Sequence, residues 1–303
     1  MKTVLLTLIF TVVTITGLMA YPIEPRPLRK LIIESQHIIA GYVTGTYEVN
    51  KKEDRRHYAR IDILEQLQGK IRTKTIEVGF SPWMGCPAPA VYHDSTYVLA
   101  FLDKRDGSYY THALSYGAKT LTPEEIALYK KRILEMQQIL KLTSEQERFT
   151  RTVEWLVACA EHKVTRWEGT FELQPESDFM SHYSRDGGEN FKFALSAAQK
   201  ERLAKAFFTE TEGSESRYGD FALGDLIYKG NEEEVDQLLI RRLKALPAED
   251  FWLADDFMDR LKHRADPAKV ASIQKSLNDM LFESDKDAER KKYIEDFIKL
   301  VDY

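Results

Sequence analysis

The side chains that most often carry chemistry are scattered along this 303-residue chain. Its histidines form neither a His-Glu-x-x-His helix pair nor a His-x-His pair, the spacings that place two imidazoles on one metal ion. They are His37, His57, His93, His112, His162, His182 and His263. His93 lies near the turn at Cys86, and His112 follows on a neighbouring predicted strand, but exposed loop histidines are far commoner than metal ligands. We therefore predict neither a metal nor a cofactor.

Nucleophilic catalysis also lacks a motif here. The chain contains no Gly-x-Ser-x-Gly elbow, and neither cysteine has the surroundings of a papain-type nucleophile. Acidic runs such as Asp255-Asp256 and Glu232-Glu233-Glu234 fall at predicted helix starts or on solvated helix faces, where carboxylates complement the helix dipole or favour solubility. The residue pattern therefore favours a non-catalytic protein.

Large side chains in predicted loops are better candidates for function. Residues 81–87 place Trp83 and Met84 in a turn, where such side chains can anchor a partner. Alternatively, Trp83 folds back over the mouth of a barrel as a plug. Tyr109 and Tyr110, on a predicted hairpin, are candidates of the same kind. We predict these four residues as a binding surface.

Residues 1–20 have the pattern of a secretory leader. Lys2 supplies the positive charge, an apolar run follows, and Ala20 is the small residue before the cleavage point. The apolar run is shorter than the roughly 20 residues of a membrane-spanning helix. No cysteine follows the cut, so a lipid anchor is not expected. The leader predicts a soluble protein that is secreted or periplasmic.

Composition and cysteine content narrow the function further. The chain has 43 Lys+Arg against 48 Asp+Glu, and this mild acidity argues against binding to nucleic acid or to an anionic membrane. Its length suits two domains. In an oxidising compartment Cys86 and Cys159 can form a disulfide; the alternative is that Cys159 is a buried thiol and Cys86 is unpaired.

The front of the chain has the pattern of β-strands. In one of them, Ile76, Val78 and Phe80 alternate with other residues, as in a half-buried strand. Gly41 and Gly45 mark bends or bulges within another. The predicted strands span residues 38–49, 59–63, 75–80, 97–102 and 109–114. Such closely spaced strands predict a Greek-key barrel or a small sandwich.

Helices are expected on both sides of these strands. Residues 28–35 can form a short helix, and Thr122-Pro123-Glu124-Glu125 combines an N-cap with a capping box. An apolar stripe then continues to Leu140, so this second helix is expected to cover an end or side of the barrel.

Four pieces of the sequence together resemble a known domain. They are Gly41-Tyr-Val43, the run from Ala59 to Gly69, Cys86-Pro87, and Tyr97-Val-Leu-Ala-Phe-Leu102. Over residues 28–141 the chain resembles the netrin-like domain, the OB-fold barrel of tissue inhibitors of metalloproteinases. The resemblance implies a five-stranded OB-like barrel.

One feature of those inhibitors is absent. They begin their mature chain with a cysteine that caps the zinc of the protease, whereas this chain would begin with Tyr21. Protease inhibition therefore requires another mode and stays an alternative, because a scaffold alone does not fix a function.

From residue 143 onward, helix caps and apolar stripes recur. Helices are predicted to start at Ser144, Ser196, Asn231, Asp266 and Ser284 or Asp285, and residues 217–229 and 251–261 are also predicted to be helical. Residues 165–188 are expected to be irregular. Together these elements predict an α+β protein: a signal peptide at 1–20, an OB-like barrel with its closing helix at 21–142, and an all-α domain at 143–303, either an irregular solenoid or a bundle.

The function that these patterns favour is binding without catalysis. We expect a secreted or periplasmic protein that engages a protein or glycan through barrel loops and the helical surface. The alternatives are protease inhibition and a hydrolase with a site at the domain interface, built from residues such as His162, Trp167 and Glu168, because catalytic groups can assemble from distant positions.

Overall fold

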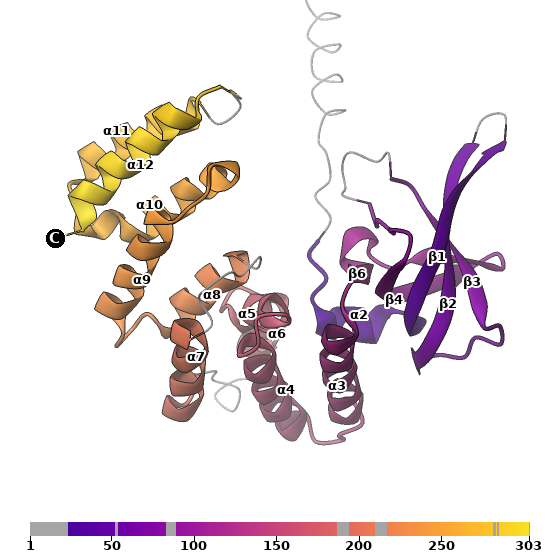
Figure 1. The fold of residues 1–303 in the computed structure, drawn as a ribbon. Coiled ribbons are helices and arrows are strands. Elements are labelled where there is room, and N and C mark those ends of the chain that lie inside the picture. Colours follow the sequence, from indigo (N-terminus) through magenta and orange to yellow (C-terminus); the bar gives the residue numbers. More distant parts are fainter. Residues whose placement is uncertain are drawn as a thin grey trace, which may run out of the picture. The chain divides into compact units, whose positions relative to one another are not determined.

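The computed structural model describes residues 24–51, 54–82, 89–186, 194–209, 217–280, 283 and 285–302. The predicted signal peptide at 1–20 lies outside these residues. The chain is α+β and divides into two compact units (Figure 1). The first unit comprises residues 1–195 and 214–222, and the second comprises 196–213 and 223–303.

A six-stranded sheet forms the front of the first unit. Its strands are β1 (His37–Lys51), β2 (Asp54–Gln68), β3 (Thr75–Phe80), β4 (Thr96–Arg105), β5 (Ser108–Thr111) and β6 (Ala118–Thr120). The order is β1-β2-β3-β5-β4-β6, and β1 also pairs with β4, so the first five strands close into a ring. All pairings are antiparallel except that of β3 with β5. The predicted strands are present, and β6 was not expected.

Side chains that alternate inward and outward along the strands give the ring an apolar interior. Residues such as Ala59, Ile61, Ile76 and Val78 point inward and are buried, while their neighbours point outward, since successive strand residues face opposite sides. The strand pairing of β1 with β2 shifts register near Gly41 and Gly45, as predicted for glycines within a strand. Bulges bend a strand, and a bent β1 suits the closure of the ring.

The described part of the first unit also contains the short 3-10 helix η1 (Leu114–Gly117), the first residues of α8 (Arg217–Ile227) and several complete α-helices. The complete α-helices are α2 (Leu28–Glu34), α3 (Pro123–Ile139), α4 (Glu145–Ala160), α5 (Arg166–Leu173) and α6 (Asp178–Asp186). The capping box predicted at Thr122 is present, because the Thr122 side chain accepts from the Glu125 N–H and the Glu125 carboxylate accepts from the Thr122 N–H. Residues 165–188 contain two helices where irregular chain was expected.

A buried carboxylate on α5 contacts α2, α3 and β6. Glu168 is 2% exposed, and its carboxylate accepts from the Leu28 N–H at 2.6 Å and from the Tyr129 hydroxyl at 3.1 Å. The Lys119 ammonium lies 2.7 Å from the same carboxylate. These contacts place α4 to α6 in one compact unit with the ring, so the division of the chain falls after the predicted boundary at residue 142.

The second unit is helical. It contains α7 (Ala197–Thr209), α9 (Glu232–Lys244), η3 (Ala248–Leu253), α10 (Ala254–Leu261), η4 (Lys262–Arg264), α11 (Pro267–Asn278) and α12 (Asp287–Val301). Helix α8 (Arg217–Ile227) crosses the division, since its first residues belong to the first unit. Within the second unit, buried Asp236 accepts from the Tyr228 hydroxyl, contacts the His263 imidazole and accepts from the Arg264 guanidinium.

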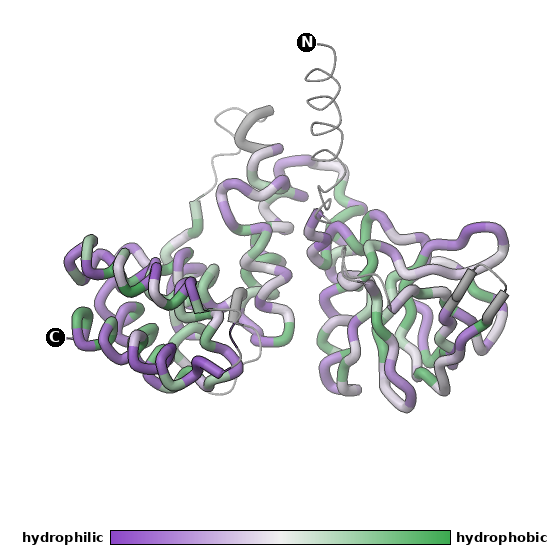
Figure 2. The backbone as a smooth tube through the Cα atoms, turned by 90° about the horizontal axis from the view of Figure 1, so that it is seen from above, coloured by the Kyte–Doolittle hydropathy of each residue, from purple (hydrophilic) through white to green (hydrophobic). Residues whose placement is uncertain are grey.

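Apolar and polar residues alternate along the helices of both units (Figure 2). Within the described ranges, no helix combines the length and the hydropathy that a membrane span requires.

Candidate functional site

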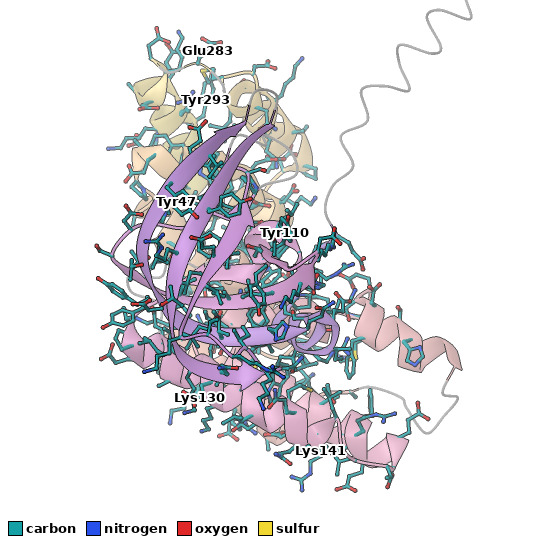
Figure 3. The ribbon with its side chains drawn as sticks, turned by 90° about the vertical axis from the view of Figure 1, so that its right-hand side faces the viewer. Tyr47, Tyr110, Lys130, Lys141, Glu283 and Tyr293 are labelled. Carbon is teal, nitrogen blue, oxygen red and sulfur yellow. The ribbon has the colours of Figure 1, made fainter. Side chains whose placement is uncertain are left out.

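Three tyrosines that are far apart in the sequence lie on the outer face of the ring. Tyr47 on β1 pairs directly with Tyr58 on β2, and their rings stack with centroids 5.7 Å apart and an interplanar angle of 22°. Tyr110 on β5 is the third, and Figure 3 labels Tyr47 and Tyr110. Because Ala59, next to Tyr58, points into the core, Tyr58 points away from it.

Gly79 on β3 lets two of these tyrosines approach each other. It pairs with Tyr58 on one side and with Tyr110 on the other. A Cβ at Gly79 would lie 3.1 Å from the Tyr110 ring and 3.7 Å from the Tyr58 ring. The two rings therefore cover the space that a side chain would fill. We call Tyr47, Tyr58 and Tyr110, with Gly79 beneath them, the tyrosine band.

Two charged residues flank the tyrosine band. The Arg60 guanidinium lies 5.8 Å from the centroid of the Tyr47 ring, within the range of a cation–π contact. It also lies 3.5 Å from the carboxylate of Glu77 on β3. A side-chain hydrogen bond to Glu77 raises the pKa of Tyr47, and partial burial adds to this effect. Glu77 thus holds both the phenol and the guanidinium at the same place on the outer face.

A second tyrosine pair lies on the same face. Tyr42 on β1 pairs directly with Tyr97 on β4, and their rings meet edge to face with centroids 5.1 Å apart. Tyr97 is 38% exposed. Aromatic side chains are therefore available to solvent on both sides of β1.

Of the four predicted binding residues, one belongs to the tyrosine band. Trp83 and Met84 lie outside the described residues. Tyr109 points inward, where its ring packs against the core and lies 5.6 Å from the His37 ring. Only Tyr110 points outward, because neighbouring strand residues face opposite sides.

Sequence reasoning missed Tyr47 and Tyr58. They are eleven positions apart in the chain, and only the register of the β1–β2 hairpin makes them neighbours. A signal did exist at Gly79, since a glycine inside a strand often marks the close approach of another group.

His112 joins two elements of the first unit. Its Nδ1 lies 2.9 Å from the Asp103 carboxylate at the end of β4, and its Nε2 lies 3.2 Å from the Glu34 carboxylate at the end of α2. His112 therefore links β4 to α2 through both of its ring nitrogens.

Each of the three residues predicted for a hydrolase site contacts other residues of the protein. The Glu168 carboxylate is buried and accepts hydrogen bonds from the Leu28 N–H and the Tyr129 hydroxyl. The Trp167 ring stacks on Tyr116 with centroids 5.6 Å apart. Nδ1 of His162 accepts from the N–H of Val164 at 3.3 Å. These contacts serve packing and local structure.

Cys159 is fully buried, and among the described residues it has no disulfide partner. Burial raises the pKa of this thiol well above its usual range, so the reactive thiolate is disfavoured. Its predicted partner Cys86 lies outside the described residues, and the disulfide stays a prediction. In the part of the chain described, no group of three or more His, Cys, Asp or Glu residues is placed to hold a metal ion.

A scan against protein-family models gives no match, and a search of curated proteins finds no similar sequence. Function is therefore inferred from the tyrosine band and its surroundings.

Proposed function

We propose that this chain is an exported, non-catalytic protein that binds a protein partner through the tyrosine band. The observation that carries the proposal is the convergence of Tyr58 and Tyr110 over Gly79, with Tyr47 stacked on Tyr58. Tyrosine and arginine are the side chains that most often dominate binding energy at protein interfaces. Here three tyrosines and Arg60 lie within one small area of the outer face.

The order of the strands supports an OB-like barrel. The ring runs β1-β2-β3-β5-β4 and back to β1, with β3 and β5 parallel. OB-folds bind their ligands mainly on the face of strands 2 and 3 and through adjoining loops. Tyr58 and Gly79 occupy those two strands in this chain. The netrin-like resemblance of residues 28–141 is part of the same proposal.

The shape of the surface favours a protein over a small ligand. The outer face of a closed ring is convex, whereas small-molecule sites are concave. Arg60 and Glu77 give the band a polar edge of both charges, which suits the mixed rim of a protein interface. Export is proposed from the leader pattern of residues 1–20.

Photo-crosslinking tests the proposal directly. Benzoylphenylalanine is placed at position 58 or 110 in cells that produce the full chain, and at position 293 as a control. Tyr293 is a tyrosine of α12 in the second unit (Figure 3). We expect the same protein adduct from positions 58 and 110 and none of it from position 293.

Two outcomes contradict the proposal. Adducts that are equally abundant from all three positions would indicate non-specific contact. A glycan array that retains the wild-type protein but not Tyr58→Ala, without any protein adduct, would assign the band to a glycan instead.

A further inference from the structure

A pocket separate from the tyrosine band lies along one side of the α3–α4 hairpin. Its volume is ≈ 490 Å³, within the range of about 300–1,000 Å³ that small-molecule sites occupy. α3 and the turn after it supply one wall, from Arg132 to Leu142, and α4 supplies the other, from Arg151 to Ala158. We call this pocket the hairpin groove.

Apolar side chains line much of the hairpin groove. They are Ile139, Leu142, Trp155 and Ala158. Trp155 is 3% exposed, and its indole N–H donates to the Arg132 carbonyl at 2.9 Å. In return, the Arg132 guanidinium donates to the Ala158 carbonyl at 2.7 Å. These reciprocal bonds fix the spacing of the two helices, so the groove is already formed without a ligand.

The charges around the hairpin groove are not equally engaged. Arg132 and Glu135 pair with each other at 2.9 Å, and Glu154 makes a contact of its own. Arg151 is exposed and, among the described residues, has no ion-pair partner. Within the described residues the Nε–H of Arg132 is also buried without a hydrogen-bond acceptor, although the Arg132 guanidinium is paired with Glu135. Arg151 is therefore the charged side chain of this groove that is left for an anionic ligand.

We propose that the hairpin groove binds a single-chain amphiphile with a carboxylate head, such as a medium-chain fatty acid. The alkyl chain lies on Ile139, Leu142 and Ala158, and the carboxylate pairs with Arg151 at the rim. Bidentate pairing of a guanidinium with a carboxylate gives such a head group a defined position. The apolar lining is the reason for proposing an alkyl chain, and the Arg151 guanidinium is the reason for proposing a carboxylate head.

Titration calorimetry of the full chain with decanoate, dodecanoate and decyltrimethylammonium tests this assignment. Because burial of each methylene contributes about 0.8 kcal/mol, each additional CH₂ in the groove should tighten the Kd about fourfold. Decanoate should bind and decyltrimethylammonium should not. Arg151→Glu should raise the Kd for decanoate at least tenfold. Lys131→Glu, the same charge change on α3 outside the groove, should leave the Kd within a factor of two.

Ala158→Leu provides a second variant that fills the groove without altering charge. It should abolish decanoate binding while the thermal unfolding midpoint changes little. The proposal is overturned if the wild type does not bind decanoate, if the cationic amphiphile binds equally well, or if Arg151→Glu and Lys131→Glu have the same effect. None of these results depends on the tyrosine band.

Discussion

At the scale of single residues, His37 is held in a site that disfavours its charged form. Its Nδ1 is buried and has no hydrogen-bond partner within the described residues. Gly69, with φ of 73°, passes so close that a Cβ there would lie 2.3 Å from that nitrogen. Burial lowers the pKa of His37, and repulsion from Lys104 lowers it further. The folded protein therefore binds this proton less readily than the unfolded chain does.

This lowered pKa predicts a pH dependence of stability. In the unfolded chain His37 titrates at about 6.5. Its contribution to stability is therefore fully present above that value and is lost as the pH falls through the lower pKa of the folded state. Between pH 7 and pH 5, the free energy of unfolding should fall more for the wild type than for His37→Gln. Urea denaturation at several pH values measures both, and parallel pH curves would contradict the prediction.

Cys159 gives a second prediction at this scale. Its thiol is buried and its pKa is raised, so the thiolate needed for reaction is scarce in the folded protein. In Cys86→Ser, Ellman's reagent at pH 8 should detect no thiol until denaturant is added. Rapid reaction of the folded variant would show that this thiol is accessible. Wild-type protein without reductant that yields no thiol even when unfolded would support the predicted disulfide.

At the scale of elements, α5 supplies the cap that α2 lacks. Pro27 precedes α2 and provides no side-chain cap, so the first N–H of the helix, that of Leu28, needs another acceptor. Glu168 of α5 accepts it from 140 positions further along the chain. Its negative charge also complements the positive end of the helix dipole. A neighbouring pair, Arg29 with Glu172, joins the same two helices.

Removal of the Glu168 carboxylate should therefore destabilise the first unit strongly. Glu168→Ala leaves the buried Leu28 N–H without an acceptor and the Lys119 ammonium without its ion-pair partner, at a cost of about 3–5 kcal/mol, whereas the Tyr129 hydroxyl keeps the Val164 carbonyl as an acceptor. Denaturant unfolding followed by circular dichroism measures the change.

The exposed pair of Lys130 and Glu65 provides the control for this experiment. Glu65→Ala should change the free energy of unfolding by less than about 1 kcal/mol, because surface ion pairs contribute little. Equal losses in the two variants would mean that Glu168 does not organise the unit.

At the scale of the whole molecule, local patterns predicted most elements but not their grouping. Alternation in residues 75–80 and the capping box at Thr122 are local signals, and the structure confirms both elements. Helix α5 escaped prediction because it carries buried Glu168 and Glu172 on the side that packs inward, so it lacks a simple apolar stripe. Gly169, in the same helix, touches the backbone of α4, where a Cβ would lie 2.2 Å from the Leu156 carbonyl.

The tyrosine band could be predicted only in part. Tyr110 is predictable from the sequence, because aromatic residues near a turn often bind partners. Tyr47 and Tyr58 depend on the register of a hairpin, and their approach to Tyr110 depends on the closure of the ring by the parallel pairing of β3 with β5. These are long-range properties that a short sequence window does not contain.

The most direct test of the central claim is to measure the affinity of the crosslinked partner for two variants, each of which lacks one tyrosine. Tyr58→Ala removes the middle of the tyrosine band, whereas Tyr293→Ala removes a tyrosine from α12. If the tyrosine band is the binding surface, Tyr58→Ala should raise the Kd at least about 30-fold, which corresponds to a loss of about 2 kcal/mol in binding free energy. Tyr293→Ala should leave the Kd within twofold of the wild type. Equal affinities for the wild type and Tyr58→Ala would contradict the account.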